Sequence, residues 1–104
     1  MRQVKFSTNW NNKLDCRCFT TIRLKNPSKH KLNEVYAILL KNSVHKKAEI
    51  VSIRTIYYSQ INEYIARLDT GYPEAEAKGI IKRMYPNVDL KTKPFSFILF
   101  QTIK

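Results

Sequence analysis

A short stretch near the N-terminus gathers side chains that could do chemistry. Residues 15–24 read DCRCFTTIRL and place two thiols, two hydroxyls and two guanidinium groups among apolar residues that must be at least partly buried. Polar groups held among buried residues need partners, so we expect them to converge on a binding pocket. The candidates for that pocket are Arg17, Cys18, Thr21 and Arg23.

The two cysteines predict neither a disulfide framework nor a metal centre. Cys16 and Cys18 are neighbours at C-x-C spacing, and such neighbours in one strand point to opposite faces and do not bridge easily. His30 and His45 stand alone, so the sequence has no second pair of ligands at zinc spacing. We therefore expect no metal and no cofactor, and two free thiols fit a reducing cytoplasm.

The charge of the chain favours a polyanionic partner. Its 104 residues include 19 Lys and Arg against 8 Asp and Glu, a formal net charge of +11. On a small domain this charge creates a positive surface potential that attracts nucleic acid. The alternative is ordinary solvated charge that keeps the domain in solution. We expect no membrane association, because no apolar run approaches the roughly 20 residues of a spanning helix.

Two basic segments could add affinity for phosphate if the fold brings them to one rim. They would then form a track for a nucleic-acid backbone, and if they are scattered they are ordinary solvated charge. The first segment is Lys25, Lys29, His30 and Lys31, and the second is Lys41, His45, Lys46 and Lys47.

Hydrophobic periodicity predicts one α+β domain that spans residues 1–104. Besides the stretch at 15–24, strands are predicted at 3–7, 35–40, 48–57 and 95–103, with 35–40 as the central strand. A change of apolar parity between Ile50 and Ile53 predicts a bulge where the sheet curls. Trp10 and Leu14, four residues apart, predict a single helical turn in which Trp10 covers the core.

Two helices are predicted before the last strand. Ser59 can cap the first helix, and Gly71 can close it in the left-handed conformation. Pro73 suits the first turn of the second helix, and Pro86 ends it. Gly79 lowers the stability of that helix by roughly 1 kcal/mol relative to alanine, which predicts a close contact there. The predicted buried stripes are Ile61, Tyr64, Ile65 and Leu68 in the first helix, and Ala77, Ile80, Ile81 and Met84 in the second.

The motifs and their order resemble the ASCH domain of the PUA-like superfamily over nearly the whole chain. The motifs are CFTTIR at 18–23, NEVY at 33–36, LDTG at 68–71 and MYP at 84–86, followed by the aromatic strand. The resemblance implies a PUA-like/ASCH β-barrel with helices packed on it and a cleft lined by the family's G-x-K-x-x-T-x-R stretch. It also implies work on RNA or nucleosides: some members are amidohydrolases acting on 4-acetylcytidine, some cleave RNA, and others are known or thought to bind RNA.

The family's functional residues carry over only in part. Its Thr falls on Thr21 and its Arg on Arg23, but its Lys falls on Cys18. In the amidohydrolase members that Lys is taken to activate the Thr hydroxyl, together with an acidic residue for which the nearest acid here is Asp69. A hydroxyl without an adjacent base is a poor nucleophile, so Thr21 has no evident activation. Cys18 could replace it if Arg17 or Arg23 lowers the pKa of the thiol, although a cysteine in such a strand is more often a small core residue.

Arg23 lies between two apolar residues and needs a partner. A carboxylate, Asp69 or Glu34, would make it part of a structural pair, whereas a phosphate or base would make it a ligand-binding residue. We expect RNA or a nucleotide-like ligand in a cleft formed by Cys18, Thr21, Arg23 and Asp69, with the basic segments contributing phosphate affinity.

Two other functions stay open. The first is a small hydrolase, acting on an amide of a modified pyrimidine nucleoside or on RNA, that uses Thr21 with Asp69 or Cys18. The second is a protein-interaction adaptor whose charge serves only to keep it in solution. The adaptor predicts that all nucleic-acid binding is lost at physiological salt.

Overall fold

The computed structural model describes residues 2–103, which form five strands, two α-helices and two short 3-10 helices. This composition confirms the α+β class. The strands are β1 (Arg2–Phe6), β2 (Cys18–Leu24), β3 (Val35–Leu40), β4 (Ser43–Ile56) and β5 (Phe95–Thr102). The helices are α1 (Glu63–Thr70) and α2 (Glu74–Met84), and the 3-10 helices are η1 (Trp10–Asp15) and η2 (Tyr58–Gln60).

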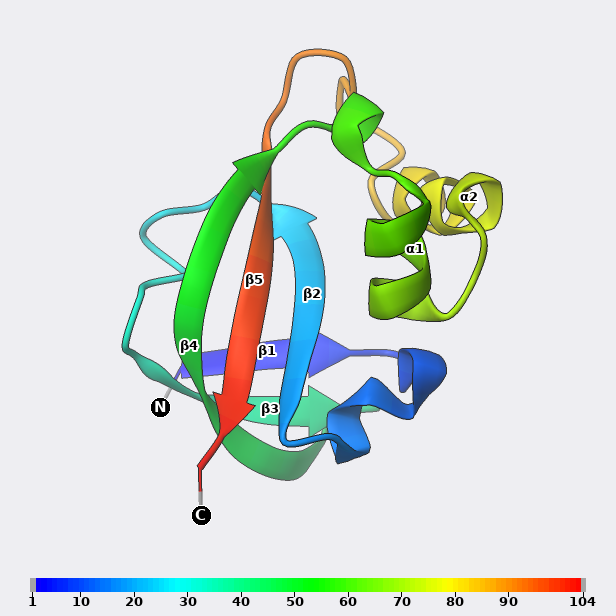
Figure 1. The fold of residues 1–104 in the computed structure, drawn as a ribbon. Coiled ribbons are helices and arrows are strands. Elements are labelled where there is room, and N and C mark those ends of the chain that lie inside the picture. The colour runs from blue at the N-terminus through cyan, green and yellow to red at the C-terminus, as the bar shows by residue number, and fades with distance from the viewer. Residues whose placement is uncertain (1, 104) are drawn as a thin grey trace.

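The five strands form one curled sheet in the order β1-β3-β4-β5-β2. β1 pairs with β3 in parallel, and the other neighbours pair antiparallel. In Figure 1, β2, β5 and the upper part of β4 run side by side, while β1 and β3 run across below them. The sheet is therefore a half-barrel with two edges, β1 and β2. The helices α1 and α2 lie together on the β2 side (Figure 1).

The long strand β4 makes the curl. Its first half pairs with β3 and its second half pairs with β5, so one continuous strand joins the two parts of the sheet. The ladder with β5 shifts register between Ile50 and Ser52. A shift of this kind bends a strand and increases its twist. It confirms the bulge predicted between Ile50 and Ile53.

Two hydrophobic clusters hold the fold together. The first draws on all five strands and η1, and its largest fully buried side chains are Leu14, Tyr36, Ile38, Ile50, Ile98 and Phe100. The second joins β2, β4 and β5 to the two helices through Ile22, Ile56, Ile61, Ala66, Ala77, Ile81 and Phe95. The helices thus pack on the sheet by burying apolar surface, which is the main favourable contribution to folding.

The first helix differs from its prediction. It begins at Glu63 rather than after Ser59, and its N-cap is Asn62, whose side-chain oxygen accepts a hydrogen bond from the N–H of Ile65. The face that packs on the core also differs from the predicted one. Tyr64 and Leu68, predicted to be buried, are 79% and 69% exposed, and the buried residues are Ala66, Asp69 and Thr70. Gly71 ends the helix with a φ of 80°, as predicted.

The second helix is closer to its prediction. It follows Pro73 and ends at Met84, two residues before Pro86, and Ala77, Ile80 and Ile81 are buried. Met84 is half exposed. The close contact predicted at Gly79 is wrong: a Cβ there would meet only the guanidinium of Arg83, at an ordinary 3.4 Å.

Candidate functional site

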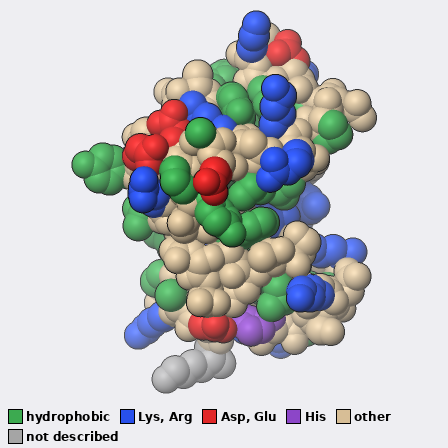
Figure 2. All heavy atoms as spheres, turned by 90° about the vertical axis from the view of Figure 1, so that its right-hand side faces the viewer, with side chains coloured by type: hydrophobic (Ala, Val, Ile, Leu, Met, Phe, Trp, Pro, Cys, Tyr) green, Lys and Arg blue, Asp and Glu red, His purple; other side chains and the backbone are tan. Residues whose placement is uncertain are grey.

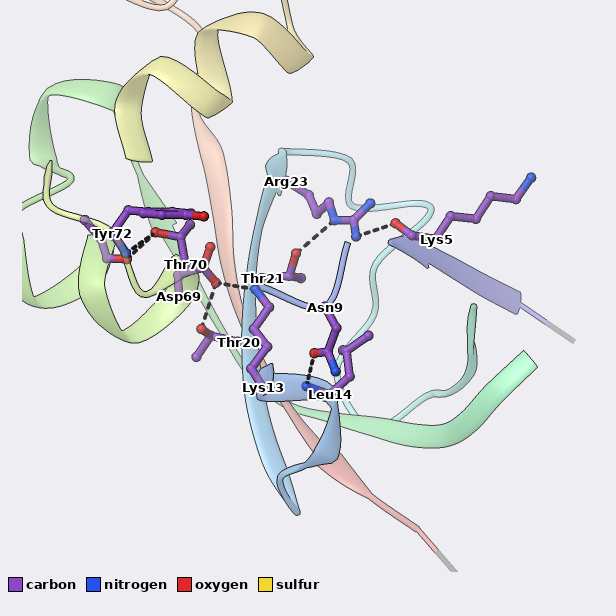
Figure 3. Close-up of polar contacts among 11 residues, drawn as sticks. Lys5, Asn9, Lys13, Leu14, Thr20, Thr21, Arg23, Asp69, Thr70 and Tyr72 are labelled. Atoms are coloured by element: carbon purple, nitrogen blue, oxygen red, sulfur yellow. Dashed lines mark hydrogen bonds and ion pairs between the residues drawn. The ribbon is translucent and has the colours of Figure 1, made fainter. Parts of the chain in front are cut away.

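Arg23 spans the gap between the two edges of the sheet. From β2, its Nε donates a hydrogen bond to Thr21 Oγ1 (2.9 Å) and its Nη2 donates to the carbonyl oxygen of Lys5 in β1 (2.6 Å). Its guanidinium also lies 4.6 Å from the ring centroid of Phe6. Figure 3 shows Arg23 reaching from β2 toward the end of β1. The edge that would close a full barrel is thus bridged by a charged side chain.

A buried ion pair lies beside this bridge. Lys13 Nζ is 3.0 Å from Asp69 Oδ1, and the two side chains are only 6% and 8% exposed. Thr20 Oγ1 donates a second hydrogen bond to the same oxygen, at 2.8 Å. Burial lowers the pKa of Lys13, against the opposing effect of Asp69, and the charge of Arg23 lowers it further. The pair joins η1 to α1 across 56 residues of sequence (Figure 3).

The local sequence of η1 fixes Lys13 in place. Asn11 and Asn12 adopt left-handed φ values of 57° and 52°, which asparagine tolerates better than most residues. Asn9 Oδ1 then accepts the N–H of Leu14 at 2.9 Å, and the Leu14 side chain is fully buried. With the residue after it anchored in this way, Lys13 can point only toward the helix.

The end of α1 places Asp69. Gly71 terminates the helix, and its Cα approaches the side chain of Asn11 so closely that an added Cβ would lie 3.0 Å from it. Thr70 Oγ1 donates to the carbonyl oxygen of Ala66 and accepts the N–H of Tyr72. The ring of Tyr72 packs edge-on against Trp10, with 5.9 Å between the centroids. These contacts dock α1 on η1.

The Arg23 bridge and the Lys13–Asp69 ion pair border one small cleft, which we call the edge cleft. It lies between β1, β2 and η1 on one side and the helices on the other, and its volume is about 40 Å³. That volume has room for about three water molecules, so it can take the oxygen atoms of a phosphate or carboxylate but no larger group. Two cations and one carboxylate lie at it: Lys13, Arg23 and Asp69. Lys5 meets Arg23 through its backbone carbonyl, and its ammonium points away (Figure 3). The other lining residues include Phe6, Trp10, Thr21, Ile80 and Met84.

Three of the four residues predicted to form the cleft are brought together there: Thr21, Arg23 and Asp69. Cys18 is not one of them, because it lies exposed at the start of β2, opposite Gln101. Arg17 precedes it on the surface and is also exposed. The predicted thiol nucleophile is therefore outside the cleft, which corrects that part of the prediction.

Arg23 does not pair with a carboxylate in the part of the chain that the structure describes. Asp69 pairs with Lys13 instead, and the ion pairs among residues 2–103 do not include Glu34. Burial lowers the pKa of Arg23, yet an arginine keeps its charge at neutral pH. Its partners are a hydroxyl, a backbone carbonyl and an aromatic ring, all of them neutral.

The two basic segments do not meet at one rim. The loop that carries Lys25, Lys29 and Lys31 precedes β3, and the turn at Lys41 follows it. Six strand residues separate them, a distance of about 20 Å.

Lys46 and Lys47 are not loop residues at all. They pair with Ile38 and Ala37 in the β3–β4 ladder. Lys46 Nζ donates to the carbonyl oxygen of Cys16 and lies over the ring of Phe19. These charges are therefore distributed over the surface rather than gathered in a track.

Sequence reasoning missed Lys13, the most buried cation of the cleft. The signal was present, since Lys13 stands three residues after Trp10 and one before Leu14. In a helical turn that spacing places it beside Trp10, on the same side as the buried face.

A second buried group lies near Arg23. His30, in the loop between β2 and β3, is 7% exposed, and its Nδ1 has no hydrogen-bond partner among the described residues. Burial lowers the pKa of His30 to about 4, with further contributions from the charges of Arg23 and Lys29. His30 is therefore a neutral imidazole at neutral pH. The second histidine, His45, lies on the surface 3.4 Å from Asp15.

Within residues 2–103, no group of three or more His, Cys, Asp and Glu side chains is arranged to hold a metal ion. None of the helices described there is both long enough and apolar enough to cross a membrane. Comparisons of the chain with protein-family models, with curated proteins and with solved structures find no match.

Proposed function

We propose that this chain binds RNA or a nucleotide-like ligand and that an anionic group of the ligand enters the edge cleft. The observation that carries the proposal is Arg23: its guanidinium is held at the cleft by neutral partners and has no carboxylate partner among residues 2–103. The cleft carries one positive charge in excess, from Lys13 and Arg23 against Asp69. The Nε of Arg23 and one N–H of its Nη2 are used by Thr21 and Lys5, so a phosphate would accept hydrogen bonds from the remaining donors on Nη1 and Nη2.

The size of the edge cleft limits what can enter it. At about 40 Å³ it has room for the oxygen atoms of a phosphate but not for a whole nucleoside. The rest of the ligand must therefore lie on the surface around the cleft. The net charge of +11 would support such binding through phosphate contacts that are independent of sequence.

The ASCH resemblance points the same way. Thr21 and Arg23, the two positions at which the chain keeps the family's motif, both line the edge cleft. The family's Lys is replaced by Cys18, but Lys13 supplies a lysine to the cleft from another element. A PUA-like half-barrel with RNA in the cleft between its edges accounts for both facts.

A hydrolase is the second candidate, and a specific contact favours it. Thr20 Oγ1 donates to Asp69 Oδ1 at 2.8 Å, which is the geometry of a hydroxyl beside a general base. Thr21 instead accepts a hydrogen bond from Arg23 and has no carboxylate contact among the described residues. In this candidate Thr20 Oγ1, rather than Thr21, attacks the amide carbonyl, and Asp69 takes its proton and passes it to the leaving amine as the C–N bond breaks. Water then hydrolyses the resulting ester and restores Thr20. Lys13, whose pKa burial lowers, would orient Asp69.

Binding titrations test the first candidate. Short single-stranded RNA and duplex DNA are titrated at low and at physiological salt with the wild-type chain, Arg23→Ala and Arg54→Ala. Arg54 is exposed on β4, so its variant removes the same charge away from the edge cleft. We expect only Arg23→Ala to abolish a preference for RNA that persists at physiological salt. If the two variants bind alike, binding depends on the overall positive charge and not on the edge cleft. If the wild-type chain binds neither polymer at physiological salt, the adaptor is favoured.

Turnover separates the two candidates. The purified chain is incubated with 4-acetylcytidine and with single-stranded RNA, and products are followed by chromatography. Hydrolysis that is lost in Thr20→Val and Asp69→Asn but kept in Cys18→Ala would establish the hydrolase. Binding without turnover would leave the RNA-binding proposal alone.

A further inference from the structure

A second groove adjoins the edge cleft. Trp10 and Ile80 line both hollows, so the two are neighbours separated by these side chains. The second groove has a volume of about 410 Å³, about ten times that of the edge cleft, and this lies within the range of small-molecule sites. It therefore has the room that the edge cleft lacks for the base of a bound nucleotide.

Aromatic rings form one wall of this groove. Trp10 and Tyr72 meet edge to face at an interplanar angle of 72°, and Tyr72 is 41% exposed. The backbone of Tyr72 is held by the hydrogen bond from its N–H to Thr70 Oγ1. Unstacked bases bind on exposed, fixed aromatic rings of this kind. Figure 2 shows hydrophobic side chains gathered across the middle of the face that carries the two helices, with Lys and Arg around them.

The opposite wall is one face of α2. Glu76, Gly79 and Arg83 follow one another at helical spacing, so they share that face. Gly79 leaves the wall open, because a Cβ at this position would meet only Arg83 Nη1. Arg83 offers guanidinium donors and a plane for stacking, and Glu76 offers an acceptor for an exocyclic amino group. The α2 side of the groove thus offers a donor in Arg83, an acceptor in Glu76 and an open backbone at Gly79.

From this arrangement we propose that one base of the bound RNA stacks in the second groove, between the Trp10–Tyr72 wall and the Gly79 face of α2, while its phosphate occupies the edge cleft. The inference rests on the proposed function, since it names where the part of the nucleotide outside the edge cleft lies. It explains why a glycine stands inside α2, where no close packing contact requires one.

Gly79→Ala is the decisive variant. Alanine has the higher helix propensity and its methyl group has space, so the melting temperature rises, by roughly 4–8 °C. The same methyl group intrudes on the base, so RNA affinity falls about 5- to 100-fold, the range of one stacking contact. A purely structural glycine would not produce a more stable protein that binds worse. A rise in melting temperature with unchanged affinity overturns the inference.

Two matched pairs of variants test the walls. Arg83→Gln is compared with Lys82→Gln, which removes the same charge from the neighbouring exposed position of α2. Tyr72→Ala is compared with Tyr64→Ala on the exposed face of α1. We expect Arg83→Gln to bind RNA more weakly than Lys82→Gln, and Tyr72→Ala to bind RNA more weakly than Tyr64→Ala. Equal losses within both pairs would contradict a base in the groove.

An abasic strand separates this inference from the proposed function. A base-bearing RNA and an abasic strand of the same length are titrated against the wild-type chain, and the fluorescence of Trp10, the single tryptophan, reports stacking. We expect quenching and tighter binding only with bases. Equal, Arg23-dependent binding of both strands would refute the groove and leave the edge cleft as a phosphate site. Failure of both strands to bind at physiological salt would refute both proposals.

Discussion

Arg23 and Lys5 join the two open edges of the half-barrel, through a hydrogen bond of 2.6 Å from Arg23 Nη2 to the Lys5 carbonyl oxygen. Edge strands present unpaired backbone groups, and proteins usually cover or interrupt them. Here the gap between β1 and β2 carries a guanidinium in place of a ladder. The same side chain therefore serves the fold and, in the proposed function, the ligand.

Replacing Arg23 by Lys separates its charge from its geometry. Lysine keeps the charge but cannot donate from a rigid fork to Thr21 and Lys5 at once. We expect Arg23→Lys to lose about 1–2 kcal/mol of unfolding free energy in urea melts, the value of one or two hydrogen bonds. RNA affinity should fall as well, although the net charge is unchanged. Arg54→Lys is the control. If Arg23→Lys binds RNA as tightly as wild type, only the charge of residue 23 contributes to RNA binding.

The Lys13–Asp69 pair should show the asymmetry of buried ion pairs. Lys13→Met leaves Asp69 buried without its cation, so we expect a loss of about 3–5 kcal/mol in unfolding free energy. Lys13→Met combined with Asp69→Leu removes both charges and should recover much of that loss. A double-mutant cycle from urea melts measures the coupling.

The exposed pair Arg67–Glu63 on α1 is the matched control for that cycle. Its side chains are 62% and 51% exposed, so solvent screens the pair and its coupling should be much smaller than that of Lys13 and Asp69. Similar coupling in the two pairs would mean that water reaches Asp69 in solution.

His30 should make the protein less stable in mild acid. Its folded pKa is about 4, and its ordinary value is 6.5, so between these values the unfolded chain binds a proton that the folded chain does not. The stabilising effect of the neutral imidazole is complete above pH 6.5 and is lost as the pH falls to about 4. Urea melts across this range measure it, and His30→Leu should flatten the slope. An imidazole NMR signal of His30 that titrates near pH 6.5 would contradict the burial.

The predictable parts of this fold are those in which a local pattern decides. The apolar run at 35–40 and the parity change near Ile50 marked β3 and the bulge, because side chains alternate along a strand whatever surrounds it. The start of α1 was not predictable in this way: Ser59 and Asn62 are both good caps, and only packing selects Asn62.

The candidate site was predictable only in part, for a related reason. Thr21 and Arg23 lie in one strand, so their proximity follows from the sequence. Lys13 joins them from another element, through turns whose left-handed asparagines cannot be placed by periodicity. The Cys18 thiol failed as a prediction because its exposure depends on where β2 begins.

The two glycines of the chain should respond to alanine with opposite signs. Gly71 has a φ of 80°, and a Cβ there would lie 3.0 Å from the side chain of Asn11, so Gly71→Ala meets both backbone strain and a clash. The strain alone costs about 1–2 kcal/mol. Gly79 is helical and open, so Gly79→Ala should gain about 1 kcal/mol.

Urea melts of the two alanine variants give these values. Because the added Cβ would clash with the side chain of Asn11, Asn11→Gly in the Gly71→Ala background should recover the steric part of the loss but not the backbone part. A Gly71→Ala variant as stable as wild type would mean that α1 does not end in the left-handed conformation, and the placement of Asp69 beside Lys13 would then lack its cause.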